Sequence, residues 1–294
     1  MNNSELQNLA HEYRKELFEK FVKVGQGHPG STFSMVEIAT TLYHGGFVRP
    51  EWDRVLISKG HATVTLYPIL TKLGIIPQKD WDSWGSTESC LRVFGNISIP
   101  GIDVTSGSLG HGIGVGLGMS MASMHKEYYT KNVYVVISEG ELYEGSTWEA
   151  LLFASHHKPK NLTIFIDINN LIILGKTKDC VNLEPIKDKI EGFGFDIYDV
   201  DGHDVGQIKD ALDKKTETTK VILARTVKGK GFSLMENKPH WHYMNQMSEE
   251  EITQCRKEIN NVSAWCFHRK SKRGYEVSIL DRSESNWISN NQKI

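Results

Sequence analysis

The sequence predicts an α/β protein in which a mostly parallel sheet is covered by helices on both faces. Three near-continuous apolar runs, at 133–138 (VYVVIS), 162–168 (LTIFIDI) and 220–226 (KVILART), are typical of strands that are buried on both faces. Helical patterns separate these runs, as the crossover connections of a parallel sheet require. With 294 residues, 39% of them hydrophobic, the chain can bury a core of this kind.

The first part of the chain predicts helices around one short strand. Apolar residues near helical spacing indicate a helix over 4–22. A second helix is predicted over about 34–44, with Ser34 as its N-cap. Residues 54–58 (RVLIS) predict a short buried strand, and a helix over about 63–73 follows it.

The second part of the chain alternates more regularly between helix and strand patterns. Besides the apolar runs above, it predicts helices over 144–157, 183–192 and 205–214 and a strand over 195–200. After about Asn260 the pattern gives way to a polar tail that contains the basic run HRKSKR at 268–273.

Composition argues against several classes of protein. Lys and Arg total 34 and Asp and Glu total 36, and this near balance argues against nucleic acid as the main partner. The stretch 104–124 lacks charged residues but is rich in glycine, serine and threonine, so we expect no membrane span there. The polar amino terminus predicts no secretory signal. The four cysteines, at 90, 180, 255 and 266, form no close pair, which favours neither zinc nor disulfides and indicates a reducing cytoplasm.

Three polar segments follow predicted strands, at 138–141 (SEGE), 169–171 (NNL) and 59–61 (KGH). The carboxyl ends of parallel strands share one edge of the sheet, where ligands bind. A carboxylate and an amide oxygen suit Mg²⁺ or Ca²⁺, and a glycine lets backbone N–H groups approach an anion. The residues alone therefore favour a metal–diphosphate site, with three ordinary loop turns as the open alternative.

The order and spacing of further motifs resemble one family. Gly140 and Asn169 are separated by 28 residues, which is similar to the thiamine-diphosphate signature that begins Gly-Asp-Gly and ends in Asn. Five blocks occur in the order found in transketolase: GHPGS at 27–31, ISKGHA at 57–62, PGIDVTSGSLGHGIGVGLGMSMA at 100–122, EGELYEGSTWEALLFASHHK at 139–158 and TVKGKGFSLMEN at 226–237. The chain thus resembles transketolase over about residues 5–255.

The resemblance covers only the amino-terminal half of that family. It implies the thiamine-diphosphate-binding fold, with 1–255 as the domain that binds the cofactor diphosphate and its metal. The pyrimidine-binding half is absent, as in split transketolases, so a separate carboxy-terminal subunit is implied, and we expect a heterotetramer. For the tail, 256–294, two interpretations stay open: an accessory that covers a partner surface through Trp265, Phe267, Tyr275 and Trp287, or a disordered end.

The resemblance also implies roles for individual residues. The metal, Mg²⁺ or Ca²⁺, would be bound by Glu139, Asn169 and the carbonyl oxygen of Leu171. The thiamine diphosphate would contact His61, Gly107, Leu109, Gly140, Glu141, Asn169, Ile173 and His242. The residues implied at the reacting end are His28, His242 and Asn96. For each histidine, a surface or capping position is the structural alternative.

Three positions depart from the family pattern. Glu139 replaces an Asp, and its extra methylene can favour an ion larger than Mg²⁺. Asn96 replaces a histidine that contacts the donor, and an amide cannot move a proton near neutral pH. Tyr243 follows His242 where the family usually has Gly. These changes indicate either a shifted substrate, which we favour, or a subunit that has lost catalysis.

The resemblance implies transfer of a two-carbon ketol or related unit from a ketose-like donor to an aldehyde-type acceptor. The chain would act only with its partner, and nucleic acid and membranes are not expected to bind. Two alternatives stay open: a cofactor-binding scaffold or regulatory subunit without turnover, and acetyl transfer from pyruvate of the deoxyxylulose-phosphate-synthase type.

Overall fold

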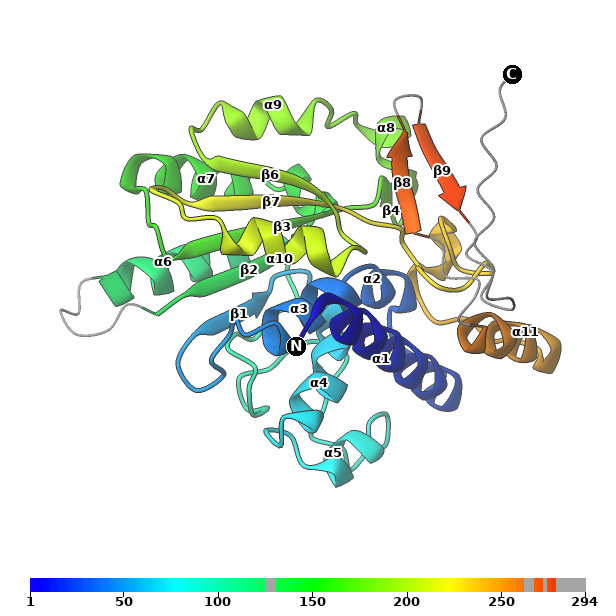
Figure 1. Cartoon of the computed structure of the whole chain (residues 1–294). Coiled ribbons are helices and arrows are strands. Elements are labelled where there is room, and N and C mark those ends of the chain that lie inside the picture. The colour runs from blue at the N-terminus through cyan, green and yellow to red at the C-terminus, as the bar shows by residue number, and fades with distance from the viewer. Residues whose placement is uncertain (125–130, 262–266, 272–273, 279–294) are drawn as a thin grey trace, which may run out of the picture.

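The central sheet consists of five strands: β1 (Arg54–Ile57), β2 (Val133–Ser138), β3 (Leu162–Ile168), β6 (Asp196–Asp201) and β7 (Lys220–Arg225). They lie in the order β1-β2-β3-β7-β6, and every neighbouring pair is parallel (Figure 1). The computed structural model describes residues 1–124 and 131–261 and the backbone of 267–271 and 274–278. The predicted fold class is confirmed.

Helices cover both faces of the sheet (Figure 1). One face carries α6 (Gly112–Met124), α7 (Gly145–His157) and α9 (Ile186–Glu191). The other face carries α1 (Asn3–Val24), α2 (Pro29–Ser34), α3 (Val36–His44), α4 (Leu66–Lys72) and α10 (Val205–Asp213). The shorter elements are the 3₁₀ helices η1 (Gly60–Thr65), η2 (Glu139–Tyr143) and η3 (Pro239–His242), the helices α5 (Gln78–Asp82), α8 (Thr177–Cys180) and α11 (Glu249–Asn260), the hairpin β4 (Leu171–Ile172) with β5 (Gly175–Lys176), and the hairpin β8 (Phe267–Ser271) with β9 (Gly274–Ser278).

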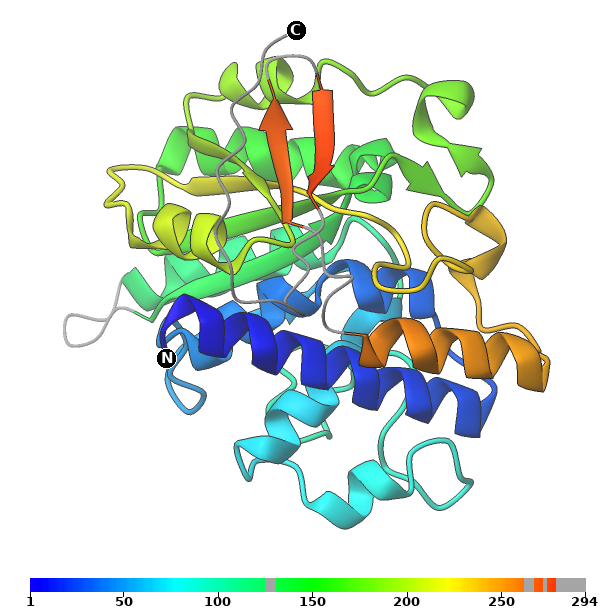
Figure 2. The same ribbon diagram turned by 45° about the vertical axis from the view of Figure 1, so that its right-hand side comes forward.

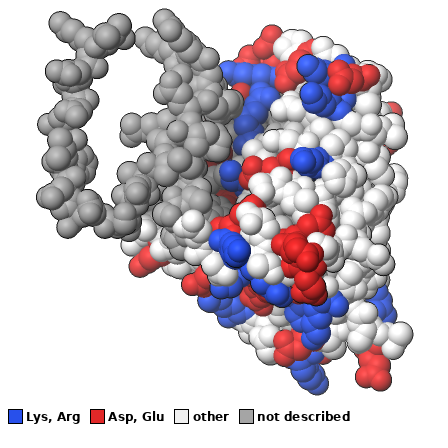
Figure 3. Space-filling view, turned by 90° about the vertical axis from the view of Figure 1, so that its right-hand side faces the viewer, with Lys and Arg blue, Asp and Glu red and all other residues white. Residues whose placement is uncertain are grey.

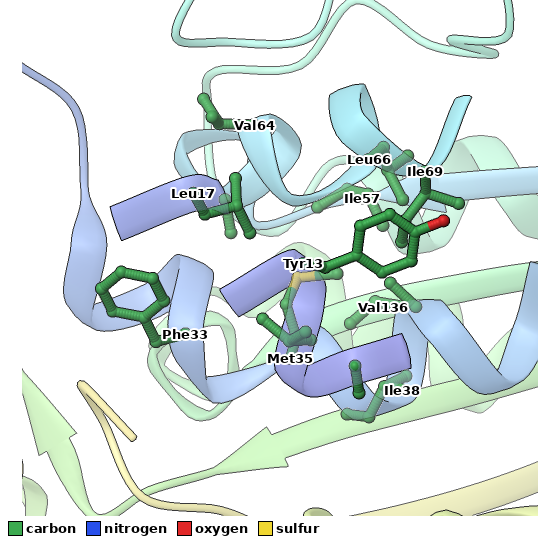
Figure 4. Packing of buried hydrophobic residues seen from close by; sticks show 14 of the residues in the cluster. Tyr13, Leu17, Phe33, Met35, Ile38, Ile57, Val64, Leu66, Ile69 and Val136 are labelled. Carbon is green, nitrogen blue, oxygen red and sulfur yellow. The ribbon is translucent and has the colours of Figure 1, made fainter. Parts of the chain in front are cut away.

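Alternate residues of each strand enter two hydrophobic cores, because successive side chains of a strand point to opposite faces. In β2, Tyr134 and Val136 pack on the α1 side, whereas Val135 and Ile137 pack on the α7 side. Figure 4 shows Val136 on the first side, among residues of α1, α3 and α4 that include Tyr13. Apolar residues on both faces explain why these strands read as continuous hydrophobic runs.

Glycines let α6 approach the sheet closely. A Cβ on Gly116 would lie 2.3 Å from the side chain of Val135, and one on Gly112 would lie 2.8 Å from the backbone of Ser58. No side chain fits at either position, so these two glycines of the run serve close packing.

The prediction of Ser34 as an N-cap is wrong. The predicted helix corresponds to α3, which begins at Val36 with Met35 as its N-cap, whereas Ser34 belongs to the separate helix α2, whose first residue is Pro29. Ser34 ends α2, and its buried hydroxyl lies within hydrogen-bond distance of two acceptors, the carbonyl of Ser31 (2.9 Å) and the carboxylate of Asp167 in β3 (2.6 Å). The predicted helix over 63–73 also differs, since its first turns form η1.

Helix α11 packs along α1 (Figure 2). Arg256 donates to both carboxylate oxygens of Glu19, at 2.9 and 2.7 Å, and Cys255 and Ile259 are fully buried in the core. The helix thus runs through residue 255, and the division into 1–255 and 256–294 stays a prediction. Of the tail aromatics, Trp265 and Trp287 lie outside the described residues.

Charges of both signs are interspersed on the face that includes α11 (Figure 3). This pattern agrees with the near-zero net charge of the sequence. Within the part of the chain that the structure describes, no helix combines the length and the apolarity needed to span a bilayer.

Candidate active site at the carboxyl edge of the sheet

The loops after β2 and β3 meet at the carboxyl edge of the sheet. Glu139 follows β2 directly and Asn169 follows β3 directly, and both are buried. The backbone N–H of Asn170 donates to Oε2 of Glu139 at 2.7 Å, so the two loops are in direct contact. The structure therefore brings into contact the two loops that carry Glu139 and Asn169, the side chains that the sequence predicts as metal ligands.

Glu139 carries a carboxylate that a cation would stabilise. Burial raises its pKa, hydrogen bonds from Thr177 and Asn170 oppose this, and the neighbouring carboxylates Asp167 and Glu184 raise the pKa further. Asn169 contributes an amide oxygen that also accepts from the N–H of Leu171 at 3.2 Å. Carboxylate, amide and carbonyl oxygens are the ligands of Mg²⁺ and Ca²⁺.

This donor set is incomplete by itself. Among the described residues, no cluster of three or more His, Cys, Asp or Glu side chains could hold a metal ion. An octahedral ion at Glu139 and Asn169 would need further oxygen ligands from outside the chain, and a diphosphate supplies such oxygens. The residues fit a metal that is bound together with a phosphate ligand.

Glu141 joins three loops of this edge. Its carboxylate is fully buried and accepts from the Ser58 hydroxyl, from the N–H of Gly110 at 3.0 Å and from the N–H of Ser138 at 2.8 Å. Burial raises its pKa, and these hydrogen bonds lower it in part. Glu141 therefore ties the segment 107–110 to the ends of β1 and β2.

Three histidines that are distant in sequence form a cluster beside these loops. The ring of His28 lies 5.1 Å from that of His61 and 5.3 Å from that of His242, and the last two are 5.3 Å apart. His61 also bonds through Nε2 to the Ser31 hydroxyl at 2.9 Å. Nδ1 of His28 is buried and has no hydrogen-bond partner among the described residues.

The three imidazoles are neutral at physiological pH. Burial and then the charge of Lys228 lower the pKa of His28 to about 4 and that of His242 to about 3. Burial and then Lys59 hold the pKa of His61 well below its usual range. A neutral imidazole has one N–H donor and one acceptor, so the cluster can hydrogen-bond carbonyl and hydroxyl groups of a ligand.

Lys228 is a site residue that the sequence motifs above do not single out. It lies on the loop after β7, is 2% exposed, and its Nζ is 3.1 Å from Nδ1 of His242. Burial lowers its pKa to about 8. A signal was available, since TVKGKGF follows the strand 220–226 just as the three selected segments follow theirs.

Lys59 lies beneath the cluster in a buried ion pair with Asp167 of β3. Its Nζ also donates to the carbonyl of Ser31 at 3.1 Å and to the hydroxyl of Ser34 at 3.2 Å. Burial alone would raise the pKa of Asp167, but the Lys59 charge and its hydrogen bonds hold that pKa below its usual range. This pair joins the end of β1 to β3 under α2.

The segment that contains Asn96 reaches the histidines through another residue. The amide oxygen of Asn96 accepts from the N–H of Ser98 at 2.8 Å and so closes a local turn. Phe94 is the residue whose ring lies 5.7 Å from His28, and Tyr243 lies 4.9 Å from His28 on another side. Both aromatic rings are about half exposed, at 40% and 51%.

The remaining predicted cofactor contacts lie on loops of the same edge. Gly107 follows Ser106, whose side chain packs against Gly60 beside His61. Leu109 is half-buried on that segment, Gly140 lies in η2 beside Ile172, and Ile173 is 47% exposed between β4 and β5. Their contacts with a cofactor stay predictions.

Comparison with known proteins supports one family. Residues 7–271 match the family described as "Transketolase, thiamine diphosphate binding domain". Over 235 residues the chain is 35% identical to an apulose-4-phosphate transketolase subunit of Actinobacillus succinogenes, covering 76% of this chain and 84% of that protein. It is 33% identical to the 6-deoxy-6-sulfo-D-fructose transketolase subunit SqwG of a Clostridium species. That match covers 84% of this chain and 93% of that protein.

The fold is also that of a solved transketolase. The structure superposes on the enzyme from Campylobacter jejuni with a TM-score of 0.81 and 28% identity, over 88% of this chain. The match spans 43% of that enzyme's chain. The chain therefore belongs to the transketolase family, and the part that matches is the thiamine diphosphate-binding domain of that family.

Proposed function

We propose that this chain is the diphosphate-binding subunit of a two-chain transketolase, which transfers a two-carbon unit from a ketose donor to an aldehyde acceptor. The observation that carries the proposal is the convergence of the Glu139–Asn170 contact, Lys228 and three neutral histidines at one edge of the sheet. A divalent cation and an anionic ligand match that set of groups. The proposal agrees with the names of the two relatives described above.

Glu139, Asn169 and the carbonyl of Leu171 would hold Mg²⁺ or Ca²⁺, and Lys228 with His61 and His242 would hold the diphosphate of thiamine diphosphate. When bound, this cofactor supplies the nucleophilic carbon and the electron sink for cleavage of the donor's carbon–carbon bond. Lys228 donates to Nδ1 of His242, so the proton of that imidazole lies on Nε2, where it is available to a ligand.

His28 is the protein group best placed to hydrogen-bond a hydroxyl group of the donor. Its Nδ1 lacks a partner among the described residues, and its low pKa keeps the ring neutral, so it can accept a hydrogen bond from that hydroxyl. Phe94 and Tyr243 flank this ring. Aromatic walls suit the carbon skeleton of a ketose and leave hydrogen bonding to the imidazoles.

A partner subunit would complete the site. Beside the site, α6 and α7 expose an apolar face that includes Val115 (40%), Leu152 (66%) and Phe153 (49%). Gly114 and Gly118 of α6 have open space around them. Exposed apolar patches of this kind mark interaction surfaces. We propose that the pyrimidine-binding subunit covers this face in a cytoplasmic heterotetramer.

The test uses the complex of this chain with a separate carboxy-terminal transketolase subunit. The complex is assayed with thiamine diphosphate, Mg²⁺ and a panel of ketose donors, and each chain is assayed alone. We expect turnover only in the mixture. Robust turnover by the isolated chain would refute the split site, binding without turnover would favour the scaffold alternative, and turnover with pyruvate alone as donor would favour acetyl transfer.

A further inference from the structure

A chain of buried polar groups links α1 to the loop that carries Lys228. The guanidinium of Arg14 in α1 donates to the carboxylate of Glu37 in α3 at 2.7 Å, and both side chains are 0% exposed. Nδ1 of His203, which lies between β6 and α10, is 3.0 Å from the same oxygen of Glu37. Nε2 of His203 is 2.8 Å from the backbone N–H of Val227.

These contacts define the proton position on His203. The N–H of Val227 is a donor, so Nε2 must be the acceptor and carries no proton. Nδ1 therefore carries the proton and donates to Glu37. The Glu37 carboxylate thus selects the one neutral tautomer of His203 that can accept a hydrogen bond from the N–H of Val227. Arg14 in turn keeps Glu37 ionised in a site where a carboxylate is otherwise costly.

Val227 immediately precedes Lys228, and backbone hydrogen bonds hold the residues next to this pair. The N–H of Thr226 donates to the carbonyl of Ile168, and that of Gly229 donates to the carbonyl of Gly30, both at 2.9 Å. The carbonyl of Lys228 accepts from Asn237 at 2.9 Å. The bond to His203 is the point at which a side chain from outside the loop fixes the backbone beside Lys228.

We infer that His203 is a positioning residue: by accepting from Val227, in a tautomer selected by Glu37 and Arg14, it sets the place of Lys228 against His242. Its side chain is only 11% exposed, and its two ring nitrogens are both occupied by protein groups. It has no free nitrogen for a ligand. Its effect on cofactor binding rests on the proposed function, in which Lys228 holds the diphosphate.

The test compares two variants of His203 in the full chain. His203→Leu offers no acceptor to Val227, whereas His203→Gln places an amide oxygen near the position of Nε2. Arg14 and Glu37 are less suitable, because changing either leaves a buried charge without its partner and endangers folding. His44→Leu is the matched control: it breaks a histidine bond to Tyr13 (2.8 Å) in the same helical layer, without a contact to this loop.

The first readout is the pH dependence with which Lys228 reacts with an acylating reagent, followed by mass spectrometry. In the parent chain we expect a midpoint near pH 8, because Lys228 is buried. His203→Leu should move the midpoint toward the ordinary lysine value of about 10.4. His203→Gln and His44→Leu should keep the parent profile. An unchanged profile in His203→Leu, or an equal shift in His44→Leu, would overturn the inference.

The second readout is calorimetric binding of inorganic pyrophosphate with Mg²⁺. His203→Leu should weaken it about tenfold, which is the loss expected for one net hydrogen bond, and His203→Gln should recover most of the affinity. If the parent chain binds no pyrophosphate, the proposed function fails, while the Lys228 profile still decides the role of His203. The inference about His203 fails if the parent chain, His203→Leu and His203→Gln all bind pyrophosphate equally well and all show the parent pH profile of Lys228 acylation.

Discussion

Nζ of Lys228 lies 3.1 Å from Nδ1 of His242, which joins the loop after β7 to η3. Both groups are largely buried, and the charge of Lys228 affects the protonation of His242. Burial is the main cause of the low pKa of His242, and the charge of Lys228 lowers it further. Burial also lowers the pKa of Lys228, to about 8. At pH 7 the site therefore holds the Lys228 cation beside neutral imidazoles.

This pair predicts a pH dependence of anion binding. Lys228 is charged below about pH 8 and loses its proton as the pH rises through that value. An anion needs the charged form, so pyrophosphate affinity should fall above pH 8, by up to about tenfold per pH unit. In Lys228→Arg, the guanidinium stays charged and the decrease should vanish. Titration calorimetry from pH 7 to 9.5 measures it, and parallel curves for the two proteins would contradict the assignment.

Glu139 predicts metal-dependent binding of the cofactor. Glu139→Ala and Asn169→Ala should each weaken thiamine diphosphate affinity in the assembled complex by at least 10–100-fold, the usual cost of changes around a metal. Glu139→Gln is the control, because its amide oxygen can still accept from Asn170 while the charge is lost. Glu139→Asp should tighten Mg²⁺ if the longer side chain has stretched the site. Unchanged affinity in both alanine variants would rule out the metal site.

The buried pair of Lys59 and Asp167 predicts a large effect on stability. Lys59→Met leaves an unpaired carboxylate in the core, which should cost about 3–5 kcal/mol of unfolding free energy. The double variant with Asp167→Asn should recover most of that loss. Since the pKa of Asp167 is held below its usual range, its contribution is present at neutral pH and is lost as the pH falls through the lowered value. Urea unfolding of the three proteins measures this, and a small effect of Lys59→Met would show that water reaches the pair.

The strands β2, β3 and β7 were predictable because their burial on both faces leaves continuous apolar runs. The long helices α1, α7 and α10 were predictable from periodicity for the related reason that each buries one stripe. The role of Ser34 was not predictable. Its hydrogen bond to Asp167 joins residues 133 positions apart and therefore has no local sequence pattern. Short elements such as α5 and the hairpin β4–β5 carry too few residues to show a period.

The candidate site also has some features that follow from local sequence patterns and others that depend on tertiary contacts. Glu139 and Asn169 were predictable because strand ends determine where they lie, and the family motif gave them roles. The burial of Lys228, the inward use of the Glu141 carboxylate and the chain through His203 depend on tertiary contacts. The role of Asn96 stays a prediction, and the contact of the Phe94 ring, two positions earlier, with His28 has no signal in the motif.

The apolar face of α6 and α7 predicts where the partner subunit binds. Leu152→Arg should leave the stability of the isolated chain nearly unchanged, because this side chain is 66% exposed. It should weaken assembly by about 30-fold or more, as the loss of an interface hot spot of about 2 kcal/mol does. Leu73→Arg is the control, since Leu73 is an exposed leucine after α4 on the other side of the sheet. Equal assembly of both variants, measured by analytical ultracentrifugation, would place the interface elsewhere.

The last prediction concerns the choice of donor. The rings of Phe94 and Tyr243 lie against His28, and the family resemblance implies that Asn96 replaces a histidine that touches the donor. A site that gains bulk and loses a polar contact changes the discrimination between substrates, and one small group in a pocket is worth about 10–200-fold. We therefore expect poor kcat/KM with xylulose 5-phosphate and better values with a modified ketose.

Two variants test this choice of donor. Tyr243→Gly should raise the ratio of kcat/KM for xylulose 5-phosphate to kcat/KM for the modified ketose by about tenfold. Asn96→His should change this ratio in the same direction if the side chain at position 96 reaches the donor. The change should appear in kcat/KM and not only in KM, because it alters contacts in the transition state. Steady-state kinetics of the complex with a donor panel measures these ratios. An ordinary rate with xylulose 5-phosphate in the parent, together with unchanged ratios in both variants, would show that this part of the chain does not select the donor.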